Sequence, residues 1–510
     1  MTSTRPREAE HGASELLDVE RLTTALSAEW LEQNAVLPLR VENDRIVVGT
    51  WHAAVDPLAI DDLRLLFAMD VVVQRFDEHD LRTAIRRVYA QEADTAQGVI
   101  AGMAGEARPM TNADEIPLDD LLHLANEAPV VRLVNLLLIE ALEARASDVH
   151  LEGYQDGLRV RYRVDGVLQE APSPPPHLTP AIISRLKIMA DLDIAERRIP
   201  QDGRIRLRLQ NRQVDVRVST VPTLGGESVV LRLLDKARGR ISLTELGMAD
   251  DTLELFTEVL SRPHGIVLVT GPTGSGKTTT LYAGLDMIRT GKEKILTVED
   301  PVEYELQGVP QVPVNEKVGV TFASALRSLL RQDPDIIMVG EIRDPETAQI
   351  AIQAALTGHL VLSTLHTNDA PTALTRLLDL QVAAYLVAST VDAVLAQRLV
   401  RLICPQCKME TTPDKRVRQQ LDVAALGLER VWKGAGCSYC RETGYRGRTG
   451  VYELLVMDNQ LRAEVQQRRG SEELRAMALA KGMRSLHDDG LRMVREGRTT
   501  IEEVMRVARI

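Results

Sequence analysis

Residues 271–278 are Gly-Pro-Thr-Gly-Ser-Gly-Lys-Thr, and they fit the pattern G-x-x-x-x-G-K-[ST] at every fixed position. An apolar run at 265–270 precedes them and a helix-like run at 279–288 follows, which is the strand, loop and helix context that this motif requires. Glycines let the backbone amides curl around a phosphate chain, and the helix amino terminus adds positive potential. We therefore expect this loop to bind a nucleoside triphosphate.

Two side chains of the loop have specific roles in this prediction. Lys277 supplies a point charge for the β and γ phosphates, and the Thr278 hydroxyl can ligate Mg²⁺. The residues expected to bind the nucleotide are Gly271, Pro272, Thr273, Gly274, Ser275, Gly276, Lys277, Thr278 and Thr279.

The overall composition limits the classes of function. A chain of 510 residues with 44% hydrophobic content predicts about two to four domains with buried cores. The net charge of -12 argues against non-specific binding of nucleic acid. Residues 1–20 lack the apolar segment of a signal peptide, and no apolar run is long enough to cross a membrane. We expect no nucleic-acid partner, and membrane association only through a partner or a surface.

The chain before the loop predicts two further domains. In the first, we expect helices ending near Asn34, Leu66 and Val88 and strands at 45–49 and 71–75. In the second, a long amphipathic helix from Ala128 leads into a sheet with a hairpin, 204–209 and 214–219, that has one arginine-lined face. The expected divisions are a disordered lead at 1–18, a small α/β domain at 19–90, a linker at 91–119, a sheet domain at 120–240 and an ATPase domain at 241–510.

After the loop, apolar strands at 295–298, 336–339 and 360–365 alternate with helices, which predicts a mainly parallel, doubly wound sheet. The chemistry should then gather at the carboxyl ends of the strands. Gly340 takes the place of the aspartate that usually ends the strand at 336–339. The next residue, Glu341, is therefore the candidate for polarising the attacking water. His366 follows the last of these strands and could sense the γ phosphate or bridge it to a neighbour.

The other polar residues near these strands allow either a functional or a purely structural role. Glu299, Asp300 and Glu303 are either site residues or solvated loop charges, and His359 is either functional or a packing residue. No residue of the ATPase domain is an obvious arginine finger. Arg217 and Arg232 of the sheet domain are the candidates, because one subunit's sheet could face the next subunit's nucleotide, although a solvated sheet face is the alternative.

The four cysteines form two Cys-x-x-Cys pairs, Cys404 with Cys407 and Cys437 with Cys440. A closed set of four thiolates is typical of a structural zinc site, and the long spacer predicts a small helical insertion. The zinc subdomain is expected at 400–445. The C-terminal helices, at 455–510, are expected to break at Gly482, Gly490 and Gly497.

In combination, these residues resemble the type II secretion traffic ATPases (the GspE/PulE group), which are close to the type IV pilus assembly ATPases. The resemblance covers roughly residues 120–510 and departs at Gln381, where the family has glycine. The matching stretches are Ala146-Ser-Asp-Val-His-Leu-Glu, Pro200-Gln-Asp-Gly-Arg-Ile, residues 271–278, Val298-Glu-Asp-Pro-Val-Glu-Tyr, Leu329-Leu-Arg-Gln-Asp-Pro-Asp, Gly340-Glu-Ile-Arg-Asp, Thr357-Gly-His-Leu-Val-Leu-Ser-Thr-Leu-His-Thr-Asn-Asp, Ala396-Gln-Arg-Leu-Val, the two cysteine pairs and Gly444-Tyr-Arg-Gly-Arg-Thr-Gly-Val-Tyr-Glu.

The resemblance implies an α/β fold with a RecA-like phosphate-loop NTPase domain, preceded by an α+β PAS-like sheet domain. It implies an acidic box at 299–303, an atypical Walker B residue at Glu341, a His box at 359–366, and bound ATP, Mg²⁺ and Zn²⁺. It also implies a homohexamer whose sheet-domain arginines reach the neighbouring nucleotide.

The implied function is ATP hydrolysis that drives pseudopilus assembly and export of folded proteins across the outer membrane. The implied partners are the cytoplasmic part of a bitopic inner-membrane protein, docked by residues 19–90, and a polytopic platform protein. The location would be cytoplasmic and peripheral on the inner membrane. Three alternatives stay open: a pilus assembly ATPase, a nucleic-acid translocase, against which the 3% aromatic content counts, and a nucleotide-gated scaffold without turnover.

Overall fold

A computed structural model was obtained for the chain, and it divides into two compact units, residues 1–235 and 236–510. The structure describes residues 22, 26, 28–42, 45–52, 55–67, 69–88, 96, 97, 100, 128–209, 212–235, 241–421 and 425–508. The expected lead at 1–18 lies outside the described residues, as does most of the expected linker at 91–119. In the described part of the chain, no helix combines the length and the apolar character needed to span a bilayer.

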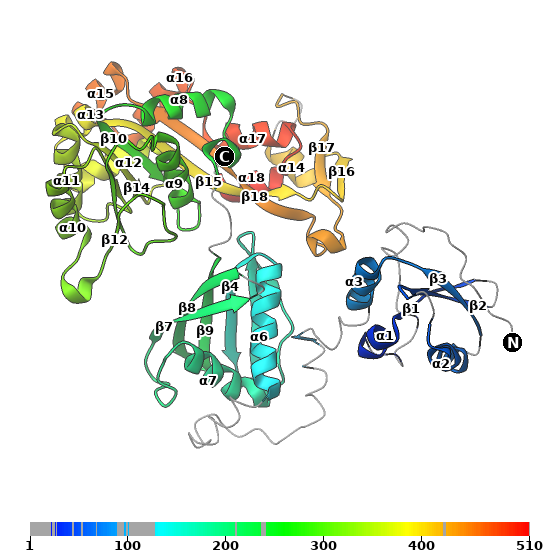
Figure 1. Ribbon diagram of the computed structural model, residues 1–510. Coiled ribbons are helices and arrows are strands. Elements are labelled where there is room, and N and C mark those ends of the chain that lie inside the picture. The colour runs from blue at the N-terminus through cyan, green and yellow to red at the C-terminus, as the bar shows by residue number, and fades with distance from the viewer. Residues whose placement is uncertain are drawn as a thin grey trace. The chain divides into compact units, whose positions relative to one another are not determined.

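The N-terminal part of the first unit is a three-stranded sheet in the order β1-β2-β3 with helices around it (Figure 1). Its elements are α1 (Ala28–Asn34), β1 (Val36–Glu42), β2 (Arg45–Thr50), α2 (Pro57–Phe67), β3 (Asp70–Arg75) and α3 (Glu78–Val88). Strand β1, which contains Pro38, was not among the expected elements. The proline is tolerated since β1 is an edge strand and its pairing with β2 shifts register between Pro38 and Arg40.

The second part of this unit is a six-stranded sheet in the order β6-β5-β4-β9-β8-β7, in which all neighbours are antiparallel. Helices α6 and α7 pack their apolar residues against it. Alternation along the predicted hairpin is confirmed, since Val214, Val216 and Val218 are buried while Arg204 and Arg206 are exposed. Its elements are α6 (Ala128–Glu143), β4 (Ala146–Tyr154), β5 (Gly157–Val164), β6 (Val167–Glu170), α7 (Thr179–Met189), β7 (Gln201–Leu209), β8 (Arg212–Thr223) and β9 (Gly226–Asp235).

The second unit is built on a seven-stranded sheet in the order β12-β11-β13-β14-β10-β15-β18. Its pairs are parallel except for β15 with β18. The phosphate-loop strand β10 therefore lies between β14 and β15. The elements of this sheet and its helices are α8 (Asp250–Leu260), β10 (Gly265–Thr270), α9 (Lys277–Ile288), β11 (Ile295–Glu299), β12 (Gln311–Pro313), α10 (Phe322–Leu329), β13 (Ile336–Val339), α11 (Pro345–Leu356), β14 (Leu360–Leu365), α12 (Ala370–Asp379), α13 (Ala384–Thr390), β15 (Val391–Ile403) and β18 (Tyr445–Val456).

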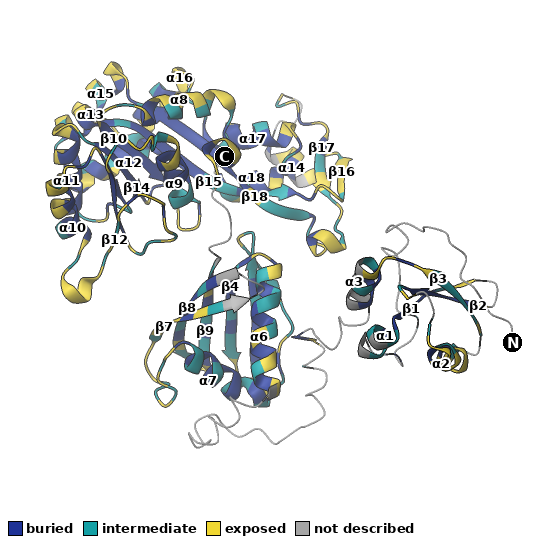
Figure 2. Ribbon diagram, viewed as in Figure 1, coloured by how far each residue is buried: buried dark blue, intermediate teal, exposed yellow. Residues whose placement is uncertain are grey.

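Both faces of this sheet are covered, so its central strands are buried along their whole length, as Figure 2 shows in dark blue. Ile266 and Leu268 of β10 join the core formed with α10, α11 and α12. Val267 and Val269 point to the opposite core, which contains residues of α8 and α9. This two-sided packing explains why the strand is continuously apolar instead of alternating.

The chain between β15 and β18 forms a small subdomain with a two-stranded sheet, and helices follow β18. The predicted helical insertion between the cysteine pairs is confirmed by α14. The elements are β16 (Lys408–Thr411), α14 (Lys415–Gln420), β17 (Val431–Gly434), α15 (Asn459–Gln466), α16 (Ser471–Ala480), α17 (Leu486–Arg495) and α18 (Ile501–Val507).

Two local expectations are corrected or explained by the backbone. The predicted break at Gly490 is wrong, because this glycine lies inside α17, where a Cβ would come within 2.6 Å of Val504. The glycine is needed for close packing of α17 on α18. At Gln381 the φ angle is 61°, a left-handed conformation that glycine adopts at lower cost, which explains the glycine of the resembled family.

Candidate functional site

The phosphate loop joins the carboxyl end of β10 to the amino end of α9. Gly274 and Gly276 have φ angles of 78° and 89°, a region that favours glycine, and Gly276 caps α9. The hydroxyl of Ser275 is buried and has no hydrogen-bond partner among the described residues. An open, glycine-rich turn with an unsatisfied donor at a helix amino terminus fits the phosphates of a nucleotide.

Lys277, the first residue of α9, folds back over the loop. Its Nζ donates hydrogen bonds to the carbonyl oxygens of Gly271, at 2.8 Å, and Pro272, at 3.2 Å. The pKa of Lys277 is lowered to about 8, mainly by burial and also by the charge of Arg398, while the charge of Glu341 opposes the shift. A phosphate chain would replace these neutral carbonyls with anionic oxygens and so favour the charged lysine.

Glu341 lies just past the carboxyl end of β13, and its side chain is only 14% exposed. One carboxylate oxygen accepts from Arg343, and the other is 3.2 Å from Nε2 of His366. The two strands that supply Glu341 and His366 are neighbours, and Thr364 ties them by donating to the Gly340 carbonyl at 2.7 Å. A carboxylate held by two basic groups at this edge can orient and polarise a water molecule.

Gly340 stands where a strand-terminal aspartate was expected, and the packing shows why. A Cβ at this position would lie 3.3 Å from the Glu299 Cα and 3.4 Å from the Phe322 ring. Both distances are shorter than ordinary contacts, so a side chain at this position would require its neighbours to shift by a few tenths of an ångström. The residue that follows, Glu341, carries the acidic group.

The acids after β11 separate into buried and exposed residues. Glu299 is 3% exposed and points into the core, where its oxygens accept from Tyr282, from Thr297 at 2.5 Å and from Gln311 at 3.0 Å. It links β11 to helix α9. Asp300 and Glu303 are exposed, and the Asp300 carboxylate lies 3.8 Å from Arg343. A catalytic role for Glu303 stays a prediction.

The two histidines of the predicted His box lie at opposite ends of β14. His366 follows the strand, whereas His359 precedes it, so about 20 Å of strand separates the two positions. Nδ1 of His359 is 2.8 Å from the Ala354 carbonyl and 3.1 Å from the Thr357 hydroxyl, at the end of α11. Of the alternatives left open for His359, these contacts favour the packing residue.

The sheet-domain arginines Arg217 and Arg232 face each other across β8 and β9. Arg232 is 55% exposed, and its Nε donates to Asp148 Oδ1 at 3.0 Å. Like charges at directly opposed positions destabilise a sheet unless a counter-charge is present, which Asp148 supplies. Their action on a nucleotide stays a prediction.

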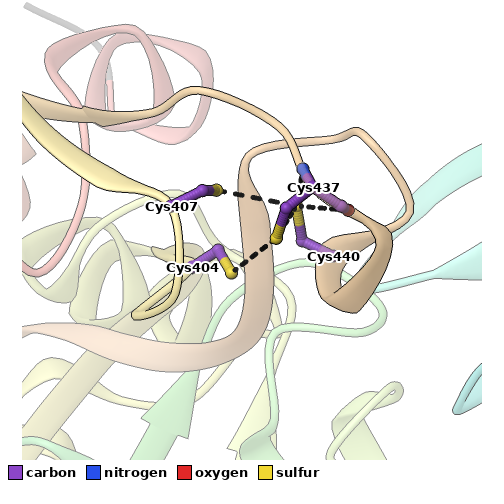
Figure 3. A group of neighbouring side chains, drawn as sticks. All are labelled: Cys404, Cys407, Cys437 and Cys440. Atoms are coloured by element: carbon purple, nitrogen blue, oxygen red, sulfur yellow. Dashed lines mark hydrogen bonds between the residues drawn. The ribbon is translucent and has the colours of Figure 1, made fainter. Parts of the chain in front are cut away.

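The four cysteines come together at the ends of β15 and β17 (Figure 3). Their sulfur atoms all lie within 4.8 Å of one another, with 3.8 Å between Cys404 and Cys437 and 3.8 Å between Cys407 and Cys440. Four thiolates bound to one zinc ion at ~2.3 Å would be about 3.8 Å apart, so the group fits tetrahedral zinc.

Backbone amides favour the thiolate form of one member of this group. Burial opposes ionisation of Cys440, but amide groups of Cys437, at 3.2 Å, and Gly444, at 3.3 Å, donate to its sulfur. These hydrogen bonds lower the pKa of Cys440 to about 7. The predicted four-cysteine cluster is confirmed.

Several site residues could not be selected from the sequence pattern. Arg343 lies within one of the stretches that match the family, but its ion pair with Glu341 could be seen only in the folded structure. Gln397 and Arg398 are on β15, a strand that the sequence analysis did not place beside the phosphate loop. Thr278 lies on the first turn of α9, and its role in binding Mg²⁺ stays a prediction.

Comparison with known proteins identifies the family. Residues 123–506 match the family described as "Type II/IV secretion system protein", and residues 11–95 match the "MshEN domain". The chain is 51% identical to the type II secretion system protein HxcR of Pseudomonas aeruginosa over 85% of this chain and 88% of that protein. It is 47% identical to the type II secretion system ATPase E of Vibrio cholerae over 84% and 86%.

Among solved structures, the pilus retraction motor PilT with bound ADP matches with a TM-score of 0.50 and 26% identity, over 73% of this chain and 96% of that one. This likeness confirms the predicted fold class, a phosphate-loop ATPase domain preceded by a sheet domain. The chain belongs to the type II/IV secretion system protein family and is a secretion ATPase of that family.

Proposed function

We propose that this chain is the motor of a type II secretion system, and that its ATP hydrolysis drives pseudopilus assembly and export of folded proteins across the outer membrane. The observation that carries the proposal is the gathering of Lys277, Glu341 and His366 at one edge of the sheet. The chain that carries these residues resembles type II secretion proteins over more than four fifths of its length.

The residues at this edge have complementary roles in hydrolysis. Lys277 neutralises the phosphate chain, and Glu341 orients a water molecule for attack on the γ phosphorus, giving ADP and phosphate. His366 and Arg343 hold the Glu341 carboxylate in place. A magnesium ion, held through Thr278, would neutralise charge on the β and γ oxygens.

The assembly that we propose is a homohexamer in which Arg217 and Arg232 act on the nucleotide of the neighbouring subunit. Residues 19–90 would dock on the cytoplasmic part of a bitopic inner-membrane protein, and a polytopic inner-membrane protein would be the platform. Membrane association would then be peripheral and indirect, on the cytoplasmic side.

The test replaces the native chain in its host by the Lys277→Ala variant, with Arg430→Gln as a control at an 80% exposed site. We expect extracellular proteins to be lost in the first strain and retained in the second, with pili present in both. Loss of pili with normal secretion would contradict the proposal and favour the pilus assembly alternative.

Assays with the purified chain separate the remaining alternatives. Steady-state ATP turnover that does not respond to single-stranded DNA is the expected result. Strong stimulation by DNA would favour a translocase, and nucleotide binding without measurable turnover would favour a scaffold.

A further inference from the structure

The stretch Ala396-Gln-Arg-Leu-Val has no role in the mechanism above, yet it lies beside the phosphate loop. Strand β15 runs parallel to β10, and Thr270 pairs with Ala396, so the next two residues of β15 flank the beginning of the loop. Gln397 is buried, and it donates to the Ser275 carbonyl at 2.5 Å and accepts from the Thr280 hydroxyl at 2.8 Å. This side chain holds the loop to the first turns of α9.

Arg398 lies against the first glycine of the loop. A Cβ on Gly271 would be 3.1 Å from Nη1 of Arg398. The guanidinium donates to the carbonyl oxygens of Gln397, at 3.1 Å, and Asn368, at 2.9 Å, and to the Asn368 side chain at 3.2 Å. All of these acceptors are uncharged, and no carboxylate of a described residue forms an ion pair with Arg398.

This arrangement places two cations around one loop without a direct anionic partner. Lys277 likewise donates to carbonyl oxygens only. Burial lowers the pKa of Arg398, although the charges of Asp369 and Glu453 oppose the shift, and the charge of Arg398 contributes to the lowered pKa of Lys277. Partly buried cations that repel each other cost free energy until an anion joins them, and a guanidinium is suited to two hydrogen bonds with a phosphate group.

We propose that Arg398 is a second cation of the nucleotide site, supplied by the same subunit, which binds the phosphate chain opposite Lys277. Its hydrogen bonds to Asn368 also tie the segment after β14, which begins with His366, to the phosphate loop. The proposal rests on residues 271–278 being the nucleotide site. It differs from the proposed role of Arg217 and Arg232, because those residues would act on the neighbouring subunit's nucleotide.

The experiment compares Arg398→Gln, Arg398→Lys, Lys277→Ala and the exposed control Arg430→Gln in the full chain. Affinity for ADP and for a non-hydrolysable ATP analogue is measured by calorimetry at several salt concentrations. We expect Arg398→Gln to bind about 10-fold or more weakly and with a smaller salt dependence, because one charge is lost, and Arg398→Lys to recover part of both. The melting temperature of each variant is measured without nucleotide, because a substitution that only damages the fold would lower it.

The outcomes distinguish a wrong role for Arg398 from a wrong assignment of residues 271–278 as the nucleotide site. Unchanged affinity and salt dependence in folded Arg398→Gln, with binding lost in Lys277→Ala, would overturn the role of Arg398 alone. Unchanged affinity in Lys277→Ala would overturn the nucleotide site itself and with it this proposal.

A second measurement uses the unsubstituted chain and needs no variant to fold. Phenylglyoxal modifies accessible arginines, and the modified peptides are quantified by mass spectrometry with and without ADP. We expect ADP to protect Arg398 and to leave Arg430 unprotected. Equal modification of Arg398 in both samples would contradict the proposal.

Discussion

At the scale of single residues, the site depends on charges held at one edge of the sheet by their neighbours. Glu341 is restrained by Arg343 and His366, and Lys277 is bonded to carbonyls of its own loop. These two residues should therefore fail in different ways when replaced, because one orients water and the other binds phosphates.

We predict that Lys277→Ala abolishes nucleotide binding and turnover, whereas Glu341→Gln retains affinity within about 3-fold and loses roughly 10²-fold or more in kcat. The amide keeps the size of the carboxylate but cannot polarise water. Equilibrium binding and steady-state turnover would be measured with Glu410→Gln, at a 51% exposed site, as the control. An equal loss of affinity in both variants would mean that Glu341 acts in nucleotide binding and not in polarising the attacking water.

The lowered pKa of Lys277, about 8 in the nucleotide-free chain, predicts a pH dependence of binding. Bound phosphates raise this pKa, so below pH 8 the lysine is charged in both states and affinity does not vary through this group. Above pH 8 binding must take up a proton, and affinity for ADP should fall by up to ~10-fold per pH unit. Calorimetry in two buffers of different ionisation enthalpy would detect the uptake, and affinity that stays flat up to about pH 9.5 would contradict the assignment.

At the scale of elements, the four cysteines connect the two ends of the subdomain that contains β16 and β17. Strands β16 and β17 form a sheet of only two strands, which is marginal by itself. A metal ion bound at both ends of this segment would contribute on the order of 10 kcal/mol to its folding.

Replacing Cys437 with serine should therefore remove stoichiometric zinc and expose residues 404–440 to protease, because one lost thiolate opens the tetrahedral set. Elemental analysis and limited proteolysis would follow the effect. The neighbouring exposed Ser438→Ala variant should keep its zinc and its resistance. Absence of zinc from the intact chain would show that the cluster is not a structural metal site.

At the scale of the whole molecule, the role of Arg217 and Arg232 requires a second subunit. If they act on the adjacent nucleotide, turnover per subunit should rise with protein concentration as rings form. Arg217→Ala should lose up to roughly 10³-fold in rate and little in affinity, because a finger acts on transition-state charge.

Mixing Arg217→Ala with Lys277→Ala tests the shared site directly. Each inactive chain retains what the other lacks, so mixed rings contain interfaces with an intact loop and an intact arginine, and partial activity should return. Native mass spectrometry would establish that rings are mixed. No recovery in such rings would mean that the arginine does not act across the interface.

The sequence by itself determined the features that depend on residues close to one another along the chain. Three such features are local patterns: the phosphate loop, the continuous apolar strand before it and the spacing of the cysteines. The structure has the expected strand before the loop, the expected helix after it and the expected helix between the cysteine pairs. Tertiary structure decided which residues meet. His359 and Glu299 belong to stretches that carry site residues. Strand direction placed His359 at the far edge of the sheet, and the layers that cover both faces of the sheet buried Glu299. Arg398 reached the phosphate loop because β15 crosses over to pair with β10. Such pairings follow from how both faces of the sheet are buried, and no short stretch of sequence contains that information.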